Sequence, residues 1–414
     1  MNRKKIYPTL LIIRFLAFIV FTVFAKIFRI KKNMPLEVKK LKPPYLVLGN
    51  HVGFWDPIIT GNFLPHFTHY VSSDAVFRKP FLRFLLNSLG TIPKKKNIRD
   101  TKVIRDIVSV IKQGENVGIY PEAVRTWVGK TQPMDASIAK LIKMLKVPVV
   151  VPVLKGMNLF NPRWSRKLRR GRVEIEYKLV FLSEDVIKLS EEEIFEKLNK
   201  AMFHDEVEYQ RKQMIKLKSK QKAEFINHTL YYCPECHAID SFRAKGNDFV
   251  CSNCNYDIHI NDYSFFERIS EGKLYYDNIR DWFKKEEDFL LKLVKEKLKS
   301  NYQGIIFQDT NSDIYYSKED IDIDLIGKAD VKLFINRIEI DFIDKEETIT
   351  LNFDDLQTIN PQVNERLEIY YAGEAYRIVG GREGVSALKW EVALNAIWKH
   401  LGQNHKLSPY IKQP

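Results

Sequence analysis

The stretch YLVLGNHVGFWDP, residues 45–57, decides our interpretation of the fold. Its first five residues form a short apolar run of the kind that makes a buried parallel strand. His51 follows this run after one asparagine, and Asp56 lies five residues further on, just before a predicted helix at 57–64. A tight turn can bring the Asp56 carboxylate to the imidazole, hold one ring nitrogen protonated and leave the other free to accept a proton. A general base acting on an alcohol near neutral pH requires that arrangement.

Both residues also have a structural interpretation. Asp56 followed by Pro57 is typical of a helix N-cap and the first helical position. His51 could equally make a purely structural hydrogen bond. A histidine and an aspartate at this spacing are a weak signal when taken alone.

The same alternation of short apolar runs and amphipathic segments continues to about residue 230. It predicts an α/β fold with a mostly parallel sheet flanked by helices. Further strands are expected at 117–120, 147–154 and 173–182, and the two prolines of 147–154 indicate an edge strand or a bulge. Further helices are expected at 80–89, 101–113 and 136–145, followed by one long charged helix at 190–227.

A second group of polar residues follows the strand at 117–120. Glu122 and Arg125 lie in the loop after it, and loops at the carboxyl ends of strands are where open α/β sheets hold their ligands. Arg125 can hold a phosphate through a forked pair of N–H groups, and Glu122 can accept from an arginine or a substrate hydroxyl. A surface ion pair of little consequence is the alternative. The run Gly90 to Lys96 supplies further cations.

In this order, the segments resemble the motifs of the lysophosphatidic acid acyltransferase (PlsC-like) family of glycerolipid acyltransferases. That family shows Asn-His-x4-Asp, Gly-x-Ile-Pro-x-x-Arg, Phe-Pro-Glu-Gly-Thr-Arg and a Val-Pro-Val strand. Here they correspond to Asn50-His51 with Asp56, Gly90 to Lys96, Tyr120 to Arg125, and Val151-Pro152-Val153. The resemblance covers about residues 1–230, and its first and third motifs are specific in combination.

Three departures from the family pattern concern the acceptor site. Ala123 and Val124 stand where the family has Gly and Thr, and Ser73-Asp74 stands where many members have a lysine. Lys96 replaces the phosphate-binding arginine, so a point charge takes the place of a fork, and Lys94, Lys95 or Arg99 could compensate. The His51–Asp56 chemistry is unaffected by these changes.

The resemblance implies an O-acyltransferase that moves an acyl chain from acyl-CoA or acyl-carrier protein to a lysophospholipid hydroxyl. The acceptor it implies is 1-acylglycerol-3-phosphate, which would become phosphatidate. His51 would be the general base and Asp56 its partner, while Glu122, Arg125, Lys96 and Arg99 would bind the acceptor. A different lyso-lipid acceptor, or a catalytically silent lipid-binding protein that keeps the fold, are the alternatives.

The N-terminal segment is largely apolar from Ile6 to Ile30, with Arg14 inside it and basic residues at both ends. A signal peptide, a spanning helix and a helix lying in the membrane interface all fit part of this pattern. We expect membrane attachment at the cytoplasmic face of the cell membrane and leave spanning and interfacial modes open. Residues 1–230 carry 43 Lys and Arg against 20 Asp and Glu, which suits an anionic lipid surface.

All four cysteines lie within 22 residues: Cys233, Cys236, Cys251 and Cys254. Two Cys-x-x-Cys pairs separated by fourteen residues have the spacing of a zinc ribbon, in which four thiolates close a structural zinc site. Four free cysteines, a redox dithiol or an iron–sulfur site are less well supported. His237 is expected on the surface. Nucleic-acid binding through the ribbon is disfavoured by its acidic surroundings.

The C-terminal part is acidic and rich in strands, predicted at 305–307, 313–316, 331–335, 337–343, 347–353, 367–371 and 375–379, with a closing helix at 386–401. This texture is similar to a pleckstrin-homology or GRAM-type barrel, a small β-barrel with one helix, which could bind a protein partner or only stabilise the chain. The expected domains are a membrane-associating segment (1–32), an acyltransferase domain (33–228), a zinc ribbon (229–262), a helical linker (263–300) and this barrel (301–405).

Overall fold

The computed structural model describes residues 6–94, 101–122, 124–318, 324–362, 366–381 and 384–407. They form two compact units. The first contains the residues up to Arg163 together with Arg169–Leu217, and the second contains Trp164–Leu168 and the residues from Lys218 onward. Each unit has a hydrophobic core of its own.

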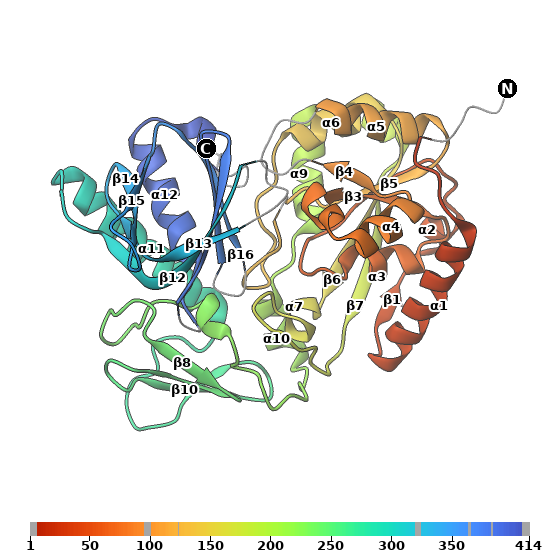
Figure 1. The fold of residues 1–414 in the computed structure, drawn as a ribbon. Coiled ribbons are helices and arrows are strands. Elements are labelled where there is room, and N and C mark those ends of the chain that lie inside the picture. Colours follow the sequence, from red (N-terminus) through yellow and green to blue (C-terminus); the bar gives the residue numbers. More distant parts are fainter. Residues whose placement is uncertain are drawn as a thin grey trace. The chain divides into compact units, whose positions relative to one another are not determined.

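A seven-stranded sheet lies at the centre of the first unit, with strand order β1-β7-β6-β2-β5-β3-β4 (Figure 1). In chain order the strands are β1 Lys31–Asn33, β2 Leu46–Leu48, β3 Thr68–Ser73, β4 Ile92–Lys94, β5 Asn116–Ile119, β6 Val149–Lys155 and β7 Glu174–Phe181. Neighbouring strands are parallel except β6 and β7, which are antiparallel. The expectation of a mostly parallel sheet is confirmed.

Helices flank this sheet. They are α1 Leu11–Ile27, α2 Leu36–Lys40, α3 Asp56–Phe63, α4 Pro80–Ser88, α5 Thr101–Lys112, α6 Ser137–Leu145, α7 Met157–Phe160, α8 Ser183–Lys188, α9 Glu191–Met202 and α10 Glu206–Gln213. Ile107 of α5, Ile142 of α6 and Leu198 of α9 share one core with the strand residues Leu46 and Val117. Burying this apolar surface is the main force that holds these helices to the sheet.

The prediction of one long helix at 190–227 is wrong. Two helices, α9 and α10, take the first part of that segment, and the chain turns between them at Phe203–Asp205. Asp205 is the reason for the break, because its carboxylate accepts the N–H groups of Val207 and Glu208 and so caps α10. After Gln213 the chain leaves the helix through Met214, which has a left-handed φ of 45°.

Strand β6 lies inside the sheet, between β7 and β2, and not at the edge that its prolines indicated. The expected bulge is present as a register shift between Val149 and Val150. Pro152 is tolerated because β2 pairs only with Val149 and Val150, so the missing N–H lies beyond the last ladder pair on that side.

The second unit begins with the cysteine-rich segment. It contains a four-stranded antiparallel sheet of β8 Phe242–Lys245, β9 Asp248–Cys251, β10 Asp257–Ile260 and β11 Phe266–Arg268. Trp282 of helix α11 (Ile279–Lys299) is fully buried in the same core. Helix α11, in the segment expected to be a linker, is therefore an integral part of this core.

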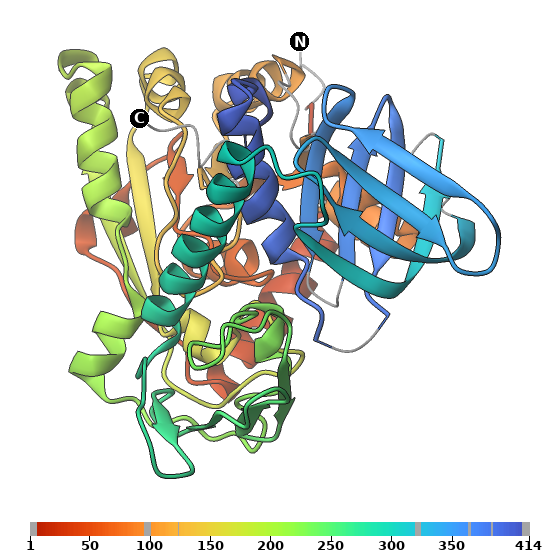
Figure 2. The same cartoon turned by 90° about the vertical axis from the view of Figure 1, so that its left-hand side faces the viewer.

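A seven-stranded antiparallel sheet and helix α12 (Leu388–His400) complete the second unit (Figure 2). Its strands are β12 Phe307–Ser317, β13 Asp324–Leu333, β14 Arg337–Phe342, β15 Thr348–Asn352, β16 Leu356–Gln362, β17 Arg366–Tyr371 and β18 Glu374–Val379. The strands expected at 305–307 and 313–316 are one continuous strand, β12, and strand β16 escaped prediction.

A buried group of charges joins three parts of the second unit. The Lys389 ammonium, on α12, lies 2.5 Å from an oxygen of Asp240 and 2.6 Å from an oxygen of Asp309 on β12. Asp240 belongs to the cysteine-rich segment, and all three side chains are buried. The indole N–H of Trp390 also donates to Asp309, at 2.7 Å. Such charges are stable in the interior only when they are paired in this way.

Candidate active site

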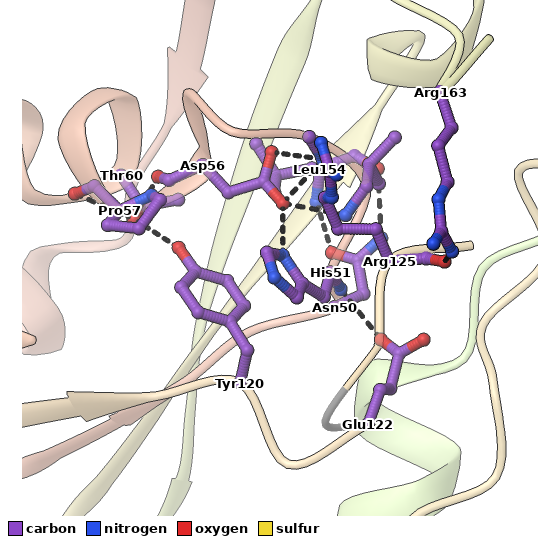
Figure 3. Close-up of polar contacts among 12 residues, drawn as sticks. Asn50, His51, Asp56, Pro57, Thr60, Tyr120, Glu122, Arg125, Leu154 and Arg163 are labelled. Carbon is purple, nitrogen blue, oxygen red and sulfur yellow. Dashed lines mark hydrogen bonds and ion pairs between the residues drawn. The ribbon is translucent and has the colours of Figure 1, made fainter. Parts of the chain in front are cut away.

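His51 and Asp56 meet in the turn between β2 and α3 (Figure 3). Nδ1 of His51 lies 2.9 Å from Oδ2 of Asp56. An ionised carboxylate only accepts hydrogen bonds, so Nδ1 carries the proton and Nε2 is left with its lone pair. The Asp56 carboxylate is fully buried, whereas the His51 side chain keeps 21% of its surface exposed. The imidazole is therefore oriented from inside the protein and reachable from outside.

The Asp56 carboxylate does not cap helix α3. It accepts the backbone N–H groups of Val52, at 2.6 Å, and Gly53, at 2.9 Å, which both precede the helix. These two donors and the imidazole N–H are the hydrogen-bond partners that a buried carboxylate needs in place of water. The Asp56 carboxylate therefore stabilises the turn and holds His51, and the interpretation of Asp56 as a helix cap is wrong.

Two buried side chains fix the backbone around His51. The Asn50 amide accepts the Leu154 N–H at 2.8 Å and donates to the Leu154 carbonyl at 3.2 Å, so it continues the sheet beyond the end of β2. Glu122 is 1% exposed, and its two oxygens accept the N–H groups of His51 at 2.7 Å and Gln132 at 2.6 Å. The contact that the structure gives Glu122 is with the His51 backbone, and binding of the acceptor by Glu122 stays a prediction.

Tyr120 and Thr60 also belong to this site, although our sequence analysis missed both roles. The Tyr120 ring stacks on the His51 imidazole, with centroids 4.6 Å apart and planes 26° apart. Its hydroxyl lies 3.0 Å from the hydroxyl of Thr60, four residues after Asp56 on α3. An aromatic residue directly before the Pro-Glu of the third motif was the available signal.

Arg125 is half-buried near the His51–Asp56 pair. Burial lowers the pKa of its guanidinium, and the charge of Asp56 acts in the opposite direction. The Arg125 carbonyl accepts a hydrogen bond of 2.8 Å from Nη1 of Arg163, whose guanidinium lies 3.7 Å above the Trp127 ring. Arg163 was also absent from our predictions. It holds the loop that carries Arg125.

The remaining predicted acceptor residues, Lys96 and Arg99, lie outside the described residues, as does Ala123. Nearby, Gly90 has a φ of +60°, and a Cβ there would come within 2.7 Å of the His69 ring. A glycine is therefore required where the chain enters β4. Lys94 closes β4 with an exposed side chain, paired in register with Ser73 of β3.

A family model described as Acyltransferase matches residues 28–155, which include β2, the His51–Asp56 turn and the Glu122–Arg125 loop. These residues are thus similar to the acyltransferase family. In addition, 127 residues of the chain are 24% identical to a 1-acyl-sn-glycerol-3-phosphate acyltransferase of Bacillus subtilis (strain 168). That match covers 30% of this chain, and the chain spans 60% of the length of this curated relative.

Two solved structures are similar to parts of the chain. PlsC, the 1-acyl-sn-glycerophosphate acyltransferase of Thermotoga maritima, is 14% identical with a TM-score of 0.41, and the match covers 49% of this chain and 81% of that one. The Vps36 N-terminal PH domain is 19% identical with a TM-score of 0.20, and the match covers 25% of this chain and 84% of that one.

Outside the acyltransferase segment, Cys233, Cys236, Cys251 and Cys254 form a cluster whose four sulfurs lie within 4.8 Å of one another. The pairs Cys233–Cys254 and Cys236–Cys251 are each separated by 3.7 Å. Zn–S bonds of about 2.3 Å in tetrahedral geometry place sulfurs about 3.8 Å apart. The cluster therefore fits a metal of this kind. His237 instead bonds the Tyr232 hydroxyl through Nδ1 at 2.5 Å.

Helix α1, which precedes the acyltransferase segment, has an apolar face turned outward. Leu11, Ile12, Phe15 and Ile27 are among its large side chains that are more than half exposed. Arg14 lies on the other side, 4.0 Å from the centre of the Phe67 ring. Within the described residues, no helix combines the length and the hydropathy that crossing a membrane would need.

The inward side of α1 reaches the catalytic turn. The Phe24 ring is stacked on Trp55, with centroids 5.5 Å apart, and Phe28 meets Phe160 of α7 at 5.1 Å. Trp55 lies directly before Asp56 in the chain. Helix α1 is thus packed against the turn that carries His51 and Asp56.

Proposed function

We propose that this chain moves an acyl group from acyl-CoA or acyl-carrier protein to the free hydroxyl of 1-acylglycerol-3-phosphate, giving phosphatidate, with His51 as general base. The observation that carries the proposal is the Nδ1–Asp56 contact of 2.9 Å at the end of a parallel strand, within residues 28–155. The Bacillus subtilis relative supports the choice of acceptor.

The proposed reaction is a direct transfer. Asp56 holds the proton on Nδ1, and Nε2 removes the proton of the acceptor hydroxyl as its oxygen attacks the thioester carbonyl carbon. The tetrahedral intermediate collapses with cleavage of the C–S bond, and the imidazolium returns the proton to the leaving thiolate. Asp56 stabilises the imidazolium between the two proton transfers.

Arg125 is the residue proposed to bind the phosphate of the acceptor, since it is half-buried beside His51 and a desolvated guanidinium gains most from an anionic partner. Lys96 and Arg99 remain proposed contributors to the same contact. For Glu122 we propose a positioning role: it holds the His51 backbone, while Arg125 binds the acceptor.

Zinc is the metal proposed for the four cysteines. Four thiolates leave no open coordination position, so the ion would stabilise the fold of residues 229–262 and take no part in acyl transfer. The sulfur separations of 3.7 Å support this assignment.

For α1 we propose an interfacial position at the cytoplasmic face of the cell membrane. An outward apolar face is costly in water and favourable in the acyl region of a lipid monolayer. Lys26, Arg29, Lys31 and Lys32 follow the face and are exposed, so they can reach anionic headgroups. A lipid acceptor would then be available close to the catalytic turn.

The test is an assay of purified protein with 1-acylglycerol-3-phosphate, other lysophospholipids, acyl-CoA and acyl-carrier protein. We expect transfer to 1-acylglycerol-3-phosphate, with no transfer by His51→Ala although that variant still binds vesicles. If the wild type acylates another lysophospholipid better, that lipid is the acceptor. The presence of Val124 in place of the family's threonine favours this alternative. Full activity in His51→Ala would show that His51 is not the general base. A wild type that binds lysophospholipids without acylating any would favour a silent lipid-binding protein.

A further inference from the structure

The imidazole of His51 is held from two directions. Asp56 holds its edge through Nδ1, and Tyr120 covers one of its faces with ring centroids 4.6 Å apart. A hydrogen bond along the ring edge leaves the imidazole able to tilt about that bond. A stacked ring opposes this motion, because tilting would lose the contact between the two faces.

Thr60 joins the two elements that hold the imidazole. Its hydroxyl lies 2.7 Å from the Asp56 carbonyl, 3.0 Å from the Tyr120 hydroxyl and 2.9 Å from the Tyr70 hydroxyl. A carbonyl oxygen can only accept, so the single proton of Thr60 points to Asp56. Both tyrosines must then donate to the two lone pairs of Thr60, which fixes the direction of every hydrogen bond in the group.

The centre of the group is buried. Thr60 is fully buried, burial raises the pKa of Tyr120 well above its usual value, and the Tyr177 hydroxyl donates to the Thr60 carbonyl at 2.7 Å. Gly118 leaves the space that the Tyr70 ring occupies, since a Cβ there would lie 2.3 Å from that ring. The Tyr120 proton is committed to Thr60, so Tyr120 is not poised to donate it to a substrate.

We propose that Tyr120 is a positioning residue for the general base, and that Thr60 places it. One threonine hydroxyl ties the ring that covers His51 to the helix start that carries Asp56, as Figure 3 shows. The two residues that hold the imidazole, Tyr120 and Asp56, are therefore fixed relative to each other by Thr60. The orientation of the ring, and with it the direction of Nε2, is then fixed as well. This proposal rests on His51 being the general base.

Kinetics of four variants test the proposal, with 1-acylglycerol-3-phosphate and acyl-CoA as probes. Tyr120→Leu removes the stacked ring and should lower kcat by about 100-fold with KM nearly unchanged, since the ring positions the base and does not touch the acceptor. Tyr120→Phe keeps the ring, loses its anchor and should lower kcat by about 3- to 10-fold. Thr60→Val removes the same anchor together with the hydrogen bonds to Asp56 and Tyr70, so it should lower kcat at least as much as Tyr120→Phe does.

The double variant and a matched control separate positioning from general stability. Tyr120→Phe combined with Thr60→Val should be no slower than Thr60→Val alone, because both changes remove the same hydrogen bond. Tyr177→Phe is the control: it deletes a buried hydroxyl from the same Thr60, at its carbonyl, and should lower Tm while leaving kcat within about twofold.

A measurement that needs no activity keeps this proposal distinct from the proposed function. The ring-proton NMR signals of His51, assigned by comparison with His51→Ala, should be shifted upfield by the Tyr120 ring current. The shift should persist in Tyr120→Phe and vanish in Tyr120→Leu. Unchanged signals in Tyr120→Leu, or equal kcat losses in Tyr177→Phe and Tyr120→Phe, would overturn the proposal. A fully active His51→Ala would overturn the general base while leaving the stacking measurable.

Discussion

The carboxylate of Glu122 accepts the backbone N–H of His51 at 2.7 Å while its other oxygen accepts that of Gln132 at 2.6 Å. One buried side chain thus connects the catalytic turn with the loop beyond Arg125. Burial raises the pKa of Glu122 to about 8, the two backbone donors lower it in part, and the charge of Asp56 raises it. The protonation state of Glu122 therefore changes slightly above neutral pH.

Stability should depend on pH through Glu122. Its pKa in the folded protein, about 8, is above the ordinary value of 4.5, so its contribution is complete below about pH 4.5 and is lost as the pH rises through about 8. Tm should fall between about pH 4.5 and about pH 8 by a few degrees more in the wild type than in Glu122→Gln. Glu184→Gln, at an exposed glutamate, is the control. Parallel curves for wild type and Glu122→Gln would contradict the prediction.

Asp56→Asn should keep the fold and lose most of the activity. An amide oxygen can still accept the Val52 and Gly53 N–H groups, but the imidazolium formed in the reaction loses its counter-charge and the tautomer is no longer fixed. We expect kcat to fall by about 10³- to 10⁴-fold. Asp185→Asn is the matched control, because that aspartate also accepts a backbone N–H beside a helix start, that of Leu182 at 2.8 Å, away from His51. Equal activity in the two variants would argue against the pair.

Arg125→Gln should weaken binding of the phosphate-bearing acceptor. Loss of a charge-assisted hydrogen bond predicts a KM for 1-acylglycerol-3-phosphate that is about 10-fold higher or more, with the KM for acyl-CoA nearly unchanged. Arg105→Gln, at an exposed position of α5, provides the comparison. If the KM for acyl-CoA rises instead, Arg125 binds the donor and the assignment is wrong.

Metal analysis should find about one zinc ion per chain, as four thiolates predict. Removing it with a chelator should lower Tm and open residues 229–262 to proteases, because the ion closes the turns of both Cys-x-x-Cys pairs. Cys236→Ser should behave like the chelated protein, whereas Ser252→Ala, which leaves all four ligands in place, should not. A protein without zinc that resists proteolysis equally well would refute a structural metal.

Flotation with vesicles that contain anionic lipid tests the outward face of α1. Ile12→Ser combined with Phe15→Ser should reduce the bound fraction several-fold, since about 25 cal/mol is lost for each Å² of apolar surface that no longer enters the lipid. Activity on detergent-dispersed acceptor should be retained. Ile187→Ser, at a residue of α8 that is 59% exposed, is the control for loss of a surface isoleucine. Unchanged flotation of the double variant would remove α1 as the contact.

The sequence was sufficient for the elements whose signal is local. The apolar run Tyr45–Gly49 indicates a strand by itself, and the segments that form α5 and α6 show the hydrophobic period of a helix. All three elements were predicted to within a few residues. Strands β3 and β4 were missed. Thr68–Ser73 alternates only weakly, and Ile92–Lys94 is three residues long, so pairing with a neighbour determines both.

Within the candidate site, the same distinction holds. His51 and Asp56 are five residues apart, and their contact follows from one turn. The parts played by Glu122 and Tyr120 depend on strands β2 and β5 lying side by side, which brings residues about 70 positions apart into contact. No local pattern contains that information. Glu122 was predicted to bind the acceptor because a sequence motif gives the residue type but not the direction in which its side chain points.

The buried Lys389–Asp240–Asp309 group has an evolutionary consequence for the C-terminal half of the chain. A truncation or a recombination event between residues 262 and 301 would separate Asp240 from Lys389, which would keep Asp309 as its partner. The buried Asp240 carboxylate would then lack its cation, at a cost of about 3–5 kcal/mol. The cysteine-rich segment and the seven-stranded sheet are therefore expected to be inherited, lost or exchanged together, as one heritable unit in spite of their distinct sequence textures.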